Sequence, residues 1–300
     1  MKILRRLFGP QDRAGVEPDH QLSTVEEPVT EPLVGATQPI APPIPSATRP
    51  LPPPKPYTST ARRLRVGHAS DVGKVRGNNQ DAVLVMVSSM DMAGTPPPLG
   101  LVIVADGMGG HTHGEQASAL AARTIAQFVA DEIYIPSLKA FEPSAEQRTI
   151  PEALVEAFEA ANAAVHLEVP DGGTTVTCAV IRADLVHIAH VGDSRAYLIS
   201  DDRMELLTRD HSLVKRLQEL GHITPEEAEQ HPQRNVLYRA IGQGDTVEVE
   251  PTTRRLPPSS QLLLCSDGLW GDIEEDELQR MVVEHSDPQE ACDSLIKAAL

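Results

Sequence analysis

The stretch LGLVIVADGMGGH at residues 99–111 places an apolar run of strand length directly before one carboxylate, Asp106, and a glycine-rich turn. The aliphatic and β-branched residues at 101–104 are typical of a strand that is buried on both faces. A carboxylate at the end of such a strand must be hydrated, hydrogen-bonded or bound to a cation, because burial of a bare charge is costly. Gly107, Gly109 and Gly110 allow the backbone to turn sharply beside it. Taken alone, the stretch is more simply explained as an Asp-Gly hairpin turn.

The same arrangement of strand and aspartate recurs along the chain, and this changes the interpretation. Asp81 directly precedes a predicted strand, Asp193 lies in the turn of a predicted hairpin, and Asp267 follows the apolar run at 262–265. Each of these residues, by itself, is more typical of a turn or a helix cap. If the strands lie side by side in a sandwich, however, all four carboxylates converge at one end.

Carboxylate oxygens are the ligands that hard divalent cations prefer. A zinc site needs histidine or cysteine at ligand spacing, and the chain lacks that pattern; His111 and His113 are better explained as solvent-exposed loop residues. A pair of cations roughly 3.5–4 Å apart would activate water and hold a phosphoryl group. Arg76, five residues before Asp81, is the best-placed guanidinium to bind a phosphate, although its spacing alone favours a surface charge.

Charge and cysteine content exclude several classes of protein. The formal net charge of −17 lies entirely in residues 62–300, which hold 20 basic and 37 acidic side chains, so a polyanion-binding face is not expected. The three cysteines are scattered and form no CxxC pair, which argues against a disulfide framework or a zinc knuckle. No apolar run reaches membrane-spanning length, and the apolar part of MKILRRLF is too short for a secretory signal. A cytoplasmic protein without a membrane span is therefore expected.

Composition divides the chain into two parts. Residues 1–60 hold 13 of the 26 prolines, and such a segment cannot bury enough apolar surface to offset its ordering entropy. We therefore expect a disordered, proline-rich N-terminal arm over residues 1–61. A tether is the favoured interpretation, and a ligand for proline-binding modules is the alternative. Residues 62–300 are expected to form the folded domain.

The folded part alternates short apolar runs with amphipathic segments. Strands are predicted at 64–69, 82–87, 101–104, 174–181, 185–190, 195–199, 247–250 and 261–265. Helices are predicted at 115–129, 151–169, 212–220, 275–285 and 287–300, with a short capped helix after Thr224. Tight turns between successive strands indicate antiparallel pairing, and we expect an α+β fold with two mainly antiparallel sheets face to face and helices outside. The polar helical segment at 208–242 is expected to be a flap over a site.

Six motifs occur in an order that resembles one known family. They are SDVGKVRGNNQDA (70–82), LVIVADGMGGH (101–111), GGTTVTCAV (172–180), HIAHVGDSRAYLI (187–199), ITPEEAEQHPQRNVLYRAIG (223–242) and LLLCSDGLWGD (262–272). Together they resemble the metal-dependent protein phosphatases of type 2C, in their bacterial serine/threonine phosphatase branch. The resemblance extends over residues 64–300, and a chance match of several motifs is very improbable.

The resemblance implies a four-layer αββα sandwich with a manganese or magnesium cluster at one end. By this resemblance, Asp106 bridges two catalytic ions, and Asp81 with the Gly107 carbonyl serves the second ion and its waters. Asp267 is a ligand of the first ion, and Asp193 with Asp267 holds a third.

The implied reaction is hydrolysis of phosphoserine and phosphothreonine by direct attack of a metal-bridging hydroxide. Arg76 binds the phosphate, the flap shapes access, and there is neither a phosphoenzyme nor a cysteine nucleophile. The implied substrates are phosphorylated proteins made by a serine/threonine kinase. We do not expect the protein to bind nucleic acid, and we expect it to be a monomer.

Two features of this chain depart from the family pattern. Met108 stands where eukaryotic relatives carry a histidine proposed as the general acid, a difference that bacterial members share. The family also closes with a GxDN motif and a terminal strand, but no Asp-Asn pair follows residue 272. Either the 300 residues are a segment of a longer chain, which the ending within a predicted helix favours, or the first metal site is incomplete. In the second case the protein would be a phosphatase-like binding or regulatory module.

Overall fold

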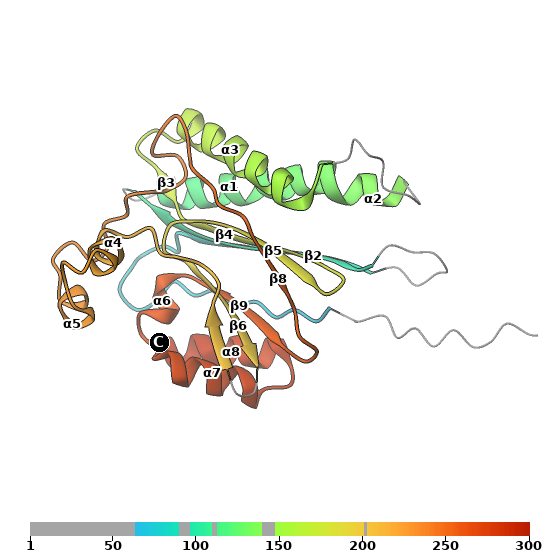
Figure 1. Cartoon of the computed structure of the whole chain (residues 1–300). Helices are drawn as coiled ribbons and strands as arrows, with labels where there is room; N and C mark the ends of the chain where they lie inside the picture. The colour runs from blue at the N-terminus through green and yellow to red at the C-terminus, as the bar shows by residue number, and fades with distance from the viewer. Residues whose placement is uncertain (1–63, 90–96, 110–112, 140–147, 201–202) are drawn as a thin grey trace, which may run out of the picture. The chain divides into compact units, whose positions relative to one another are not determined.

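The computed structural model describes residues 64–89, 97–109, 113–139, 148–200 and 203–300. The predicted N-terminal arm at 1–61 lies outside the described residues. Within them, two antiparallel sheets lie face to face, and helices cover the outer face of each (Figure 1). The predicted αββα sandwich is confirmed.

The larger sheet has the strand order β1-β2-β4-β5-β8, with the short β3 paired to the end of β2. Its strands are β1 (Asp81–Ser88), β2 (Leu99–Met108), β3 (Gly173–Thr174), β4 (Val176–Arg182), β5 (Leu185–Val191) and β8 (Thr252–Arg255). The smaller sheet has the order β7-β6-β9 and consists of β6 (Arg195–Ser200), β7 (Arg203–Leu206) and β9 (Gln261–Cys265).

Two long helices, α1 (His113–Val129) and α3 (Ile150–Glu168), cover the larger sheet, as Figure 1 shows. A π-helical turn (Ala130–Tyr134) and α2 (Ile135–Lys139) extend α1. The smaller sheet carries α6 (Asp267–Trp270), α7 (Glu275–Glu284) and α8 (Pro288–Ala299). The flap contains α4 (Leu213–Glu219) and α5 (Pro225–Glu229). No helix in the described ranges combines the length and the apolarity needed to cross a bilayer.

The layers enclose apolar cores built mainly from small and aliphatic side chains, in keeping with the low aromatic content. Ala117, Ala121 and Ile125 of α1 and Phe158 of α3 are fully buried against the larger sheet. A second core lies between the sheets, and a third lies between the smaller sheet and α7 and α8. Burial on both faces explains why β4 shows no polar alternation in its sequence.

Both predicted capping boxes are present. Thr149 and Thr224 each donate a backbone N–H to a glutamate three residues later, Glu152 and Glu227, at 2.8 Å. The glutamate's own N–H returns to the threonine hydroxyl in each case. These reciprocal bonds satisfy amide groups that a helix start otherwise leaves unpaired.

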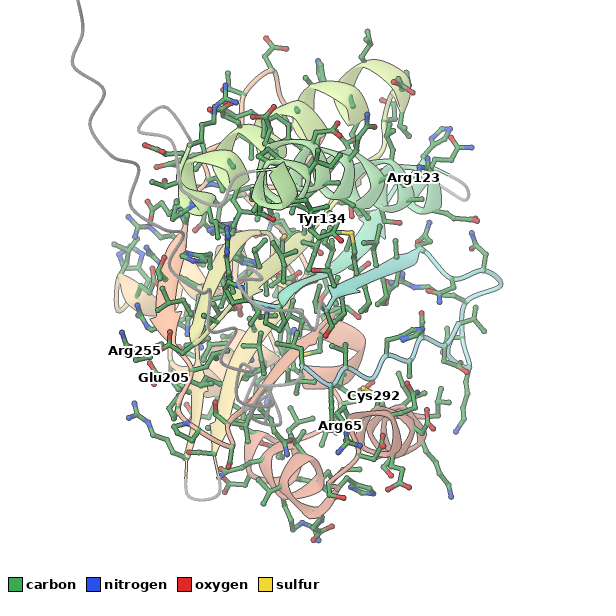
Figure 2. All side chains as sticks on the ribbon, turned by 90° about the vertical axis from the view of Figure 1, so that its right-hand side faces the viewer. Arg65, Arg123, Tyr134, Glu205, Arg255 and Cys292 are labelled. Atoms are coloured by element: carbon green, nitrogen blue, oxygen red, sulfur yellow. The ribbon has the colours of Figure 1, made fainter. Side chains whose placement is uncertain are left out.

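Two predicted strands are wrong. Residues 64–69 run beside the start of α8. Arg65, which Figure 2 labels, donates to the Ser286 carbonyl and to Asp287, so the polar contacts of this segment are to a helix end. Residues 247–250 also lie outside the sheet; the strand begins only at Thr252. Pro251 intervenes and has no N–H to donate to a ladder.

Candidate metal centre

Asp81 and Asp106 face each other across two neighbouring strands. They are paired positions of the antiparallel β1–β2 ladder, so the register itself brings their carboxylates together. Asp81 accepts a hydrogen bond from the Ser266 hydroxyl at 2.9 Å. Ser266 directly precedes Asp267, and this bond therefore ties the larger sheet to the loop that carries a third carboxylate.

Two threonines hold the backbone of Asp106. Its N–H donates to the Thr175 hydroxyl at 3.0 Å, and its carbonyl accepts from the Thr175 N–H at 2.8 Å and the Thr174 hydroxyl at 2.9 Å. The Thr175 hydroxyl also lies 2.7 Å from that of Ser194, which follows Asp193. Asp106 and the Asp193 loop are thus fixed to one another by a buried hydroxyl pair.

Glycine is required at two positions beside the aspartates, one in β2 and one directly after β5. A Cβ on Gly107 would stand 2.1 Å from the Gly114 carbonyl oxygen and 2.7 Å from that of Gln80. Gly192 has φ +110°, and a Cβ there would stand 2.5 Å from Thr175. The segments beside Asp106 and Asp193 can approach their neighbours so closely only because these side chains are absent.

The four aspartates carry charge that the protein alone does not balance. Burial, together with the charges of Asp81, Asp267 and Asp193 and a hydrogen bond with Asp267, raises the pKa of Asp106 to about 9. Burial, with the charges of Asp267 and Asp210, raises the pKa of Asp193 to about 7. Burial also raises the pKa of Asp81. Such a cluster favours either bound protons or a bound cation at neutral pH.

The donor set fits hard divalent cations that keep part of their water shell. In the described part of the chain, no group of three or more histidine, cysteine, aspartate or glutamate side chains is arranged to hold a metal ion by itself. Magnesium is commonly bound through one or two carboxylates and several waters, and manganese shares the preference for oxygen ligands. The half-buried aspartates supply carboxylate oxygens of this kind, and water supplies the remaining ligands. Histidine or cysteine ligands are not needed.

Arg76 lies at the exposed edge of the cluster. Its side chain donates to Gln80 at 3.4 Å, and its charge lowers the pKa of Asp81, against the larger effect of burial. Arg76, Asp81, Asp106 and Asp267 line one cleft of about 840 Å³, which continues between the sheets past Val83 and Val104. A phosphoryl group could therefore reach the guanidinium and the carboxylates together.

Comparison with known proteins shows the family of the chain. A family model described as protein phosphatase 2C matches residues 76–298. The chain belongs to the protein phosphatase 2C family. It is 36% identical over 230 residues to the serine/threonine phosphatase stp of Listeria innocua, covering 77% of this chain and 87% of that protein.

Solved structures of the family agree with the fold. The Mycobacterium tuberculosis serine/threonine phosphatase PstP/Ppp superposes with a TM-score of 0.63 at 33% identity, covering 77% of this chain and 90% of that one. The catalytic domain of PstP in complex with two manganese ions gives a TM-score of 0.61, also at 33% identity, covering 77% and 89%. The predicted family, fold and enzyme class are confirmed: the chain is a metal-dependent protein serine/threonine phosphatase of the bacterial type 2C branch.

The structure of this phosphatase places the predicted site residues in one region. These are Arg76, Asp81, Asp106, Gly107, Asp193 and Asp267. Of the two loop histidines, His113 is exposed at the start of α1, and His111 lies outside the described residues.

Sequence reasoning missed the side chains that support the aspartates, which are Thr174, Thr175, Ser194, Ser266 and Trp270. Each of them stands inside a quoted motif. For Ser194 and Ser266 the available signal was a hydroxyl adjacent in sequence to a candidate ligand, because ligands are commonly oriented by such neighbours.

Proposed function

We propose that this phosphatase binds divalent cations between Asp81, Asp106, Asp193 and Asp267 and removes phosphate from phosphoserine and phosphothreonine in proteins. The observation that carries the proposal is the convergence of four half-buried carboxylates, with the pKa of Asp106 raised to about 9 by burial and by its acidic neighbours. Such carboxylates are stable as anions when cations lie between them.

Each aspartate has a part in this proposal that follows from its position. Asp106 lies among the other three, since all of their charges act on it, and it would bridge two ions. Asp81, with the neighbouring Gly107 carbonyl, would serve one ion and its waters. Asp267 would bind the other ion and share a third with Asp193, whose pKa it raises.

Bound cations supply the charge that activates water and neutralises the phosphoryl group. Arg76 would hold the phosphate, since a guanidinium presents a planar fork of donors to its oxygens. Direct attack of water on the phosphoryl group is also consistent with the buried, protonated cysteine thiols. Cys178 and Cys265 are buried, and burial raises the pKa of both, in Cys265 to about 12, so neither is an available nucleophile.

The partners and the setting follow from the same chemistry. The proposed substrates are products of a serine/threonine kinase, since such a kinase makes the ester that is cleaved. We also propose that the protein is a monomer. Free thiols at Cys178, Cys265 and Cys292 support a reducing, cytoplasmic compartment. Residues 1–61 are proposed, from their proline content, to be a tether outside the phosphatase domain of residues 62–300.

The test is phosphate release from a phosphothreonine peptide with and without Mn²⁺. We expect turnover that requires added Mn²⁺ or Mg²⁺, that EDTA abolishes, and that an excess of the cation restores. Removal of a metal that contributes several kcal/mol to the transition state lowers the rate by at least about 1000-fold. Turnover that is unaffected by EDTA would contradict the proposal. Cation-dependent peptide binding without any turnover would instead establish the regulatory module.

A further inference from the structure

Arg195 is an arginine whose donors are directed into the protein. It opens β6, two residues after Asp193, and its side chain is only 16% exposed. Its Nε and Nη2 donate to the Asp210 carboxylate at 3.1 and 2.7 Å, and Nη1 donates to the Tyr197 hydroxyl at 3.0 Å. Asp210, in the flap, is 5% exposed. With its fork engaged in this way, Arg195 is not available to bind substrate, in contrast to the exposed Arg76.

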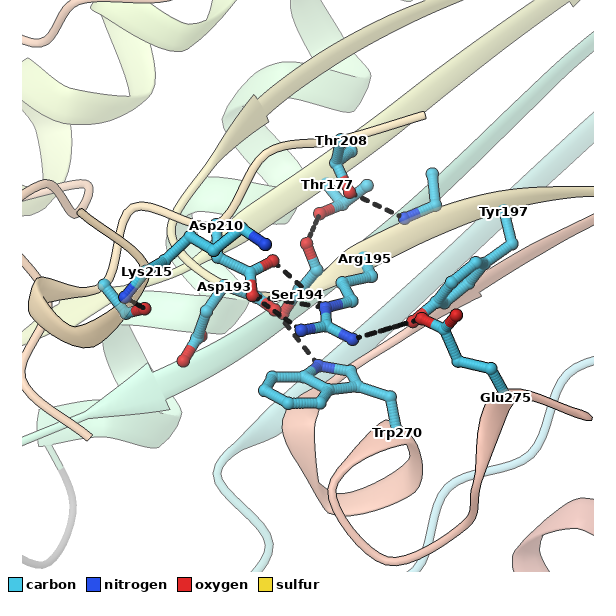
Figure 3. A network of polar contacts seen from close by, with 12 residues as sticks. Thr177, Asp193, Ser194, Arg195, Tyr197, Thr208, Asp210, Lys215, Trp270 and Glu275 are labelled. Atoms are coloured by element: carbon cyan, nitrogen blue, oxygen red, sulfur yellow. Dashed lines mark hydrogen bonds and ion pairs between the residues drawn. The ribbon is translucent and has the colours of Figure 1, made fainter. Parts of the chain in front are cut away.

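The guanidinium of Arg195 stacks on Trp270. Its central carbon lies 3.6 Å from the ring centroid, within the range of a cation–π interaction. The Trp270 indole N–H donates to the backbone carbonyl of Asp193 at 3.1 Å, as Figure 3 shows. Trp270 is also the last residue of α6, the turn that begins with Asp267. Trp270 therefore contacts the backbone of one proposed ligand, Asp193, and lies in the same helical turn as another, Asp267.

The β-ladder does not extend to these two aspartates. In the β6–β9 pair, Arg195 opposes Cys265, and the described pairing ends there. Asp193 and Asp267 lie beyond it, in a loop and in a helical turn. Their relative position is consequently set by other contacts. The Thr175–Ser194 and Ser266–Asp81 hydrogen bonds tie each segment to the larger sheet. Trp270, on which Arg195 stacks, joins the two segments directly through its bond to the Asp193 carbonyl.

We propose that Arg195 and Trp270 form a positioning clamp that holds Asp193 beside Asp267 and thereby sets the divalent-cation affinity of this side of the metal centre. The clamp acts through Asp193 and Asp267 and touches neither substrate nor cation. Because the proposal rests on the proposed ligand roles of these aspartates, its test must separate loss of the clamp from absence of the metal site.

The sharpest variant is Trp270→Phe. Phenylalanine keeps an aromatic face for Arg195 but cannot donate to the Asp193 carbonyl. We expect the dissociation constant for Mn²⁺, measured by calorimetry or by the electron paramagnetic resonance signal of free Mn²⁺, to rise about tenfold, the lower end of the effect of removing a group that orients a metal ligand. Turnover lost at low Mn²⁺ should return as the cation is raised, which a general loss of structure does not allow.

Arg195→Lys tests the other half of the clamp. Lysine keeps the charge beside Asp210 but loses both the planar fork and the stack. Trp270 is the single tryptophan of the chain, so its fluorescence reports on this place alone. We expect Mn²⁺ to quench it with a saturable midpoint in the wild type, and the midpoint to move about tenfold upward in Arg195→Lys.

Arg148→Lys is the control, because Arg148 likewise forms ion pairs, with Glu132 and Glu156, but on the helical layer that covers the larger sheet. It should leave Mn²⁺ binding unchanged. The clamp is refuted if Trp270→Phe and Arg195→Lys lower the melting temperature yet bind Mn²⁺ as the wild type does. If the wild type itself binds no Mn²⁺, the proposed metal centre fails first, and the clamp with it.

Discussion

Asp106→Asn is expected to abolish cation-dependent turnover while making the cation-free protein more stable at pH 8. The rate should fall by at least about 1000-fold, since the carboxylate that all three other aspartates surround would no longer hold the ions. An amide of nearly the same shape keeps the backbone bonds to Thr174 and Thr175. The loss therefore reflects charge and ligation, because packing is retained.

The gain in stability follows from the raised pKa of Asp106. Its pKa in the folded chain, about 9, lies above its ordinary value of 3.8, so the native state binds a proton that the unfolded state has released. Stability is fully present below pH 3.8 and is lost as the pH rises towards 9. Asp193, with a pKa of about 7, adds to this loss. His190 and His211 do not contribute near pH 8, because burial lowers their pKa values to about 4 and about 3.

Thermal denaturation in EDTA between pH 7 and 9 measures this effect. The melting temperature of the wild type should fall with rising pH, and that of Asp106→Asn should fall less and lie about 3 °C or more higher at pH 8, a shift that corresponds to roughly 1 kcal/mol in a domain of this size. Asp245→Asn is the matched control, since its side chain is 94% exposed. A variant that is less stable than the wild type at pH 8 would show that the cluster carries no uncompensated charge.

Arg76→Ala is expected to lower kcat/KM for a phosphothreonine peptide by about 10- to 100-fold. A hydrogen bond to a charged group contributes about 1.5–3 kcal/mol, and each 1.4 kcal/mol corresponds to a factor of ten. The assay is run at saturating Mn²⁺, because the charge of Arg76 also lowers the pKa of Asp81 and its removal changes the charge beside the bound cation. Arg76→Lys should recover part of the activity, since one charge remains but the fork is lost.

Lys74→Ala is the control for this prediction. Lys74 is exposed, lies in the same loop two residues earlier and also lines the cleft. It should change kcat/KM less than twofold. Equal effects of Arg76→Ala and Lys74→Ala would mean that the loop contributes only general positive charge, and that Arg76 does not hold the phosphate.

The positions of Asp81 and Asp106 at strand ends could be predicted from the sequence, because apolar runs show where strands begin and end. Asp81 lies at the start of one such run and Asp106 lies at the end of another. Antiparallel pairing of the two neighbouring strands then places the aspartates opposite one another, as the register confirms. Helix starts at Thr149 and Thr224 were equally predictable, because a capping box is a local signal.

Contacts between distant segments could not be predicted in this way. The hydroxyl pair of Thr175 and Ser194, and the bond from Ser266 to Asp81, join residues 19 and 185 positions apart. Local sequence also failed at 64–69, where an apolar segment of strand-like composition bonds to the start of α8. There, tertiary contacts override local preference.

Diffraction from crystals grown with Mn²⁺, recorded at the manganese absorption edge, tests the central claim most directly. The account predicts anomalous peaks between Asp81, Asp106 and Asp267, with Asp193 at their margin, and their loss in Asp106→Asn. The absence of any peak among these carboxylates, or peaks confined to other acidic residues, would contradict it.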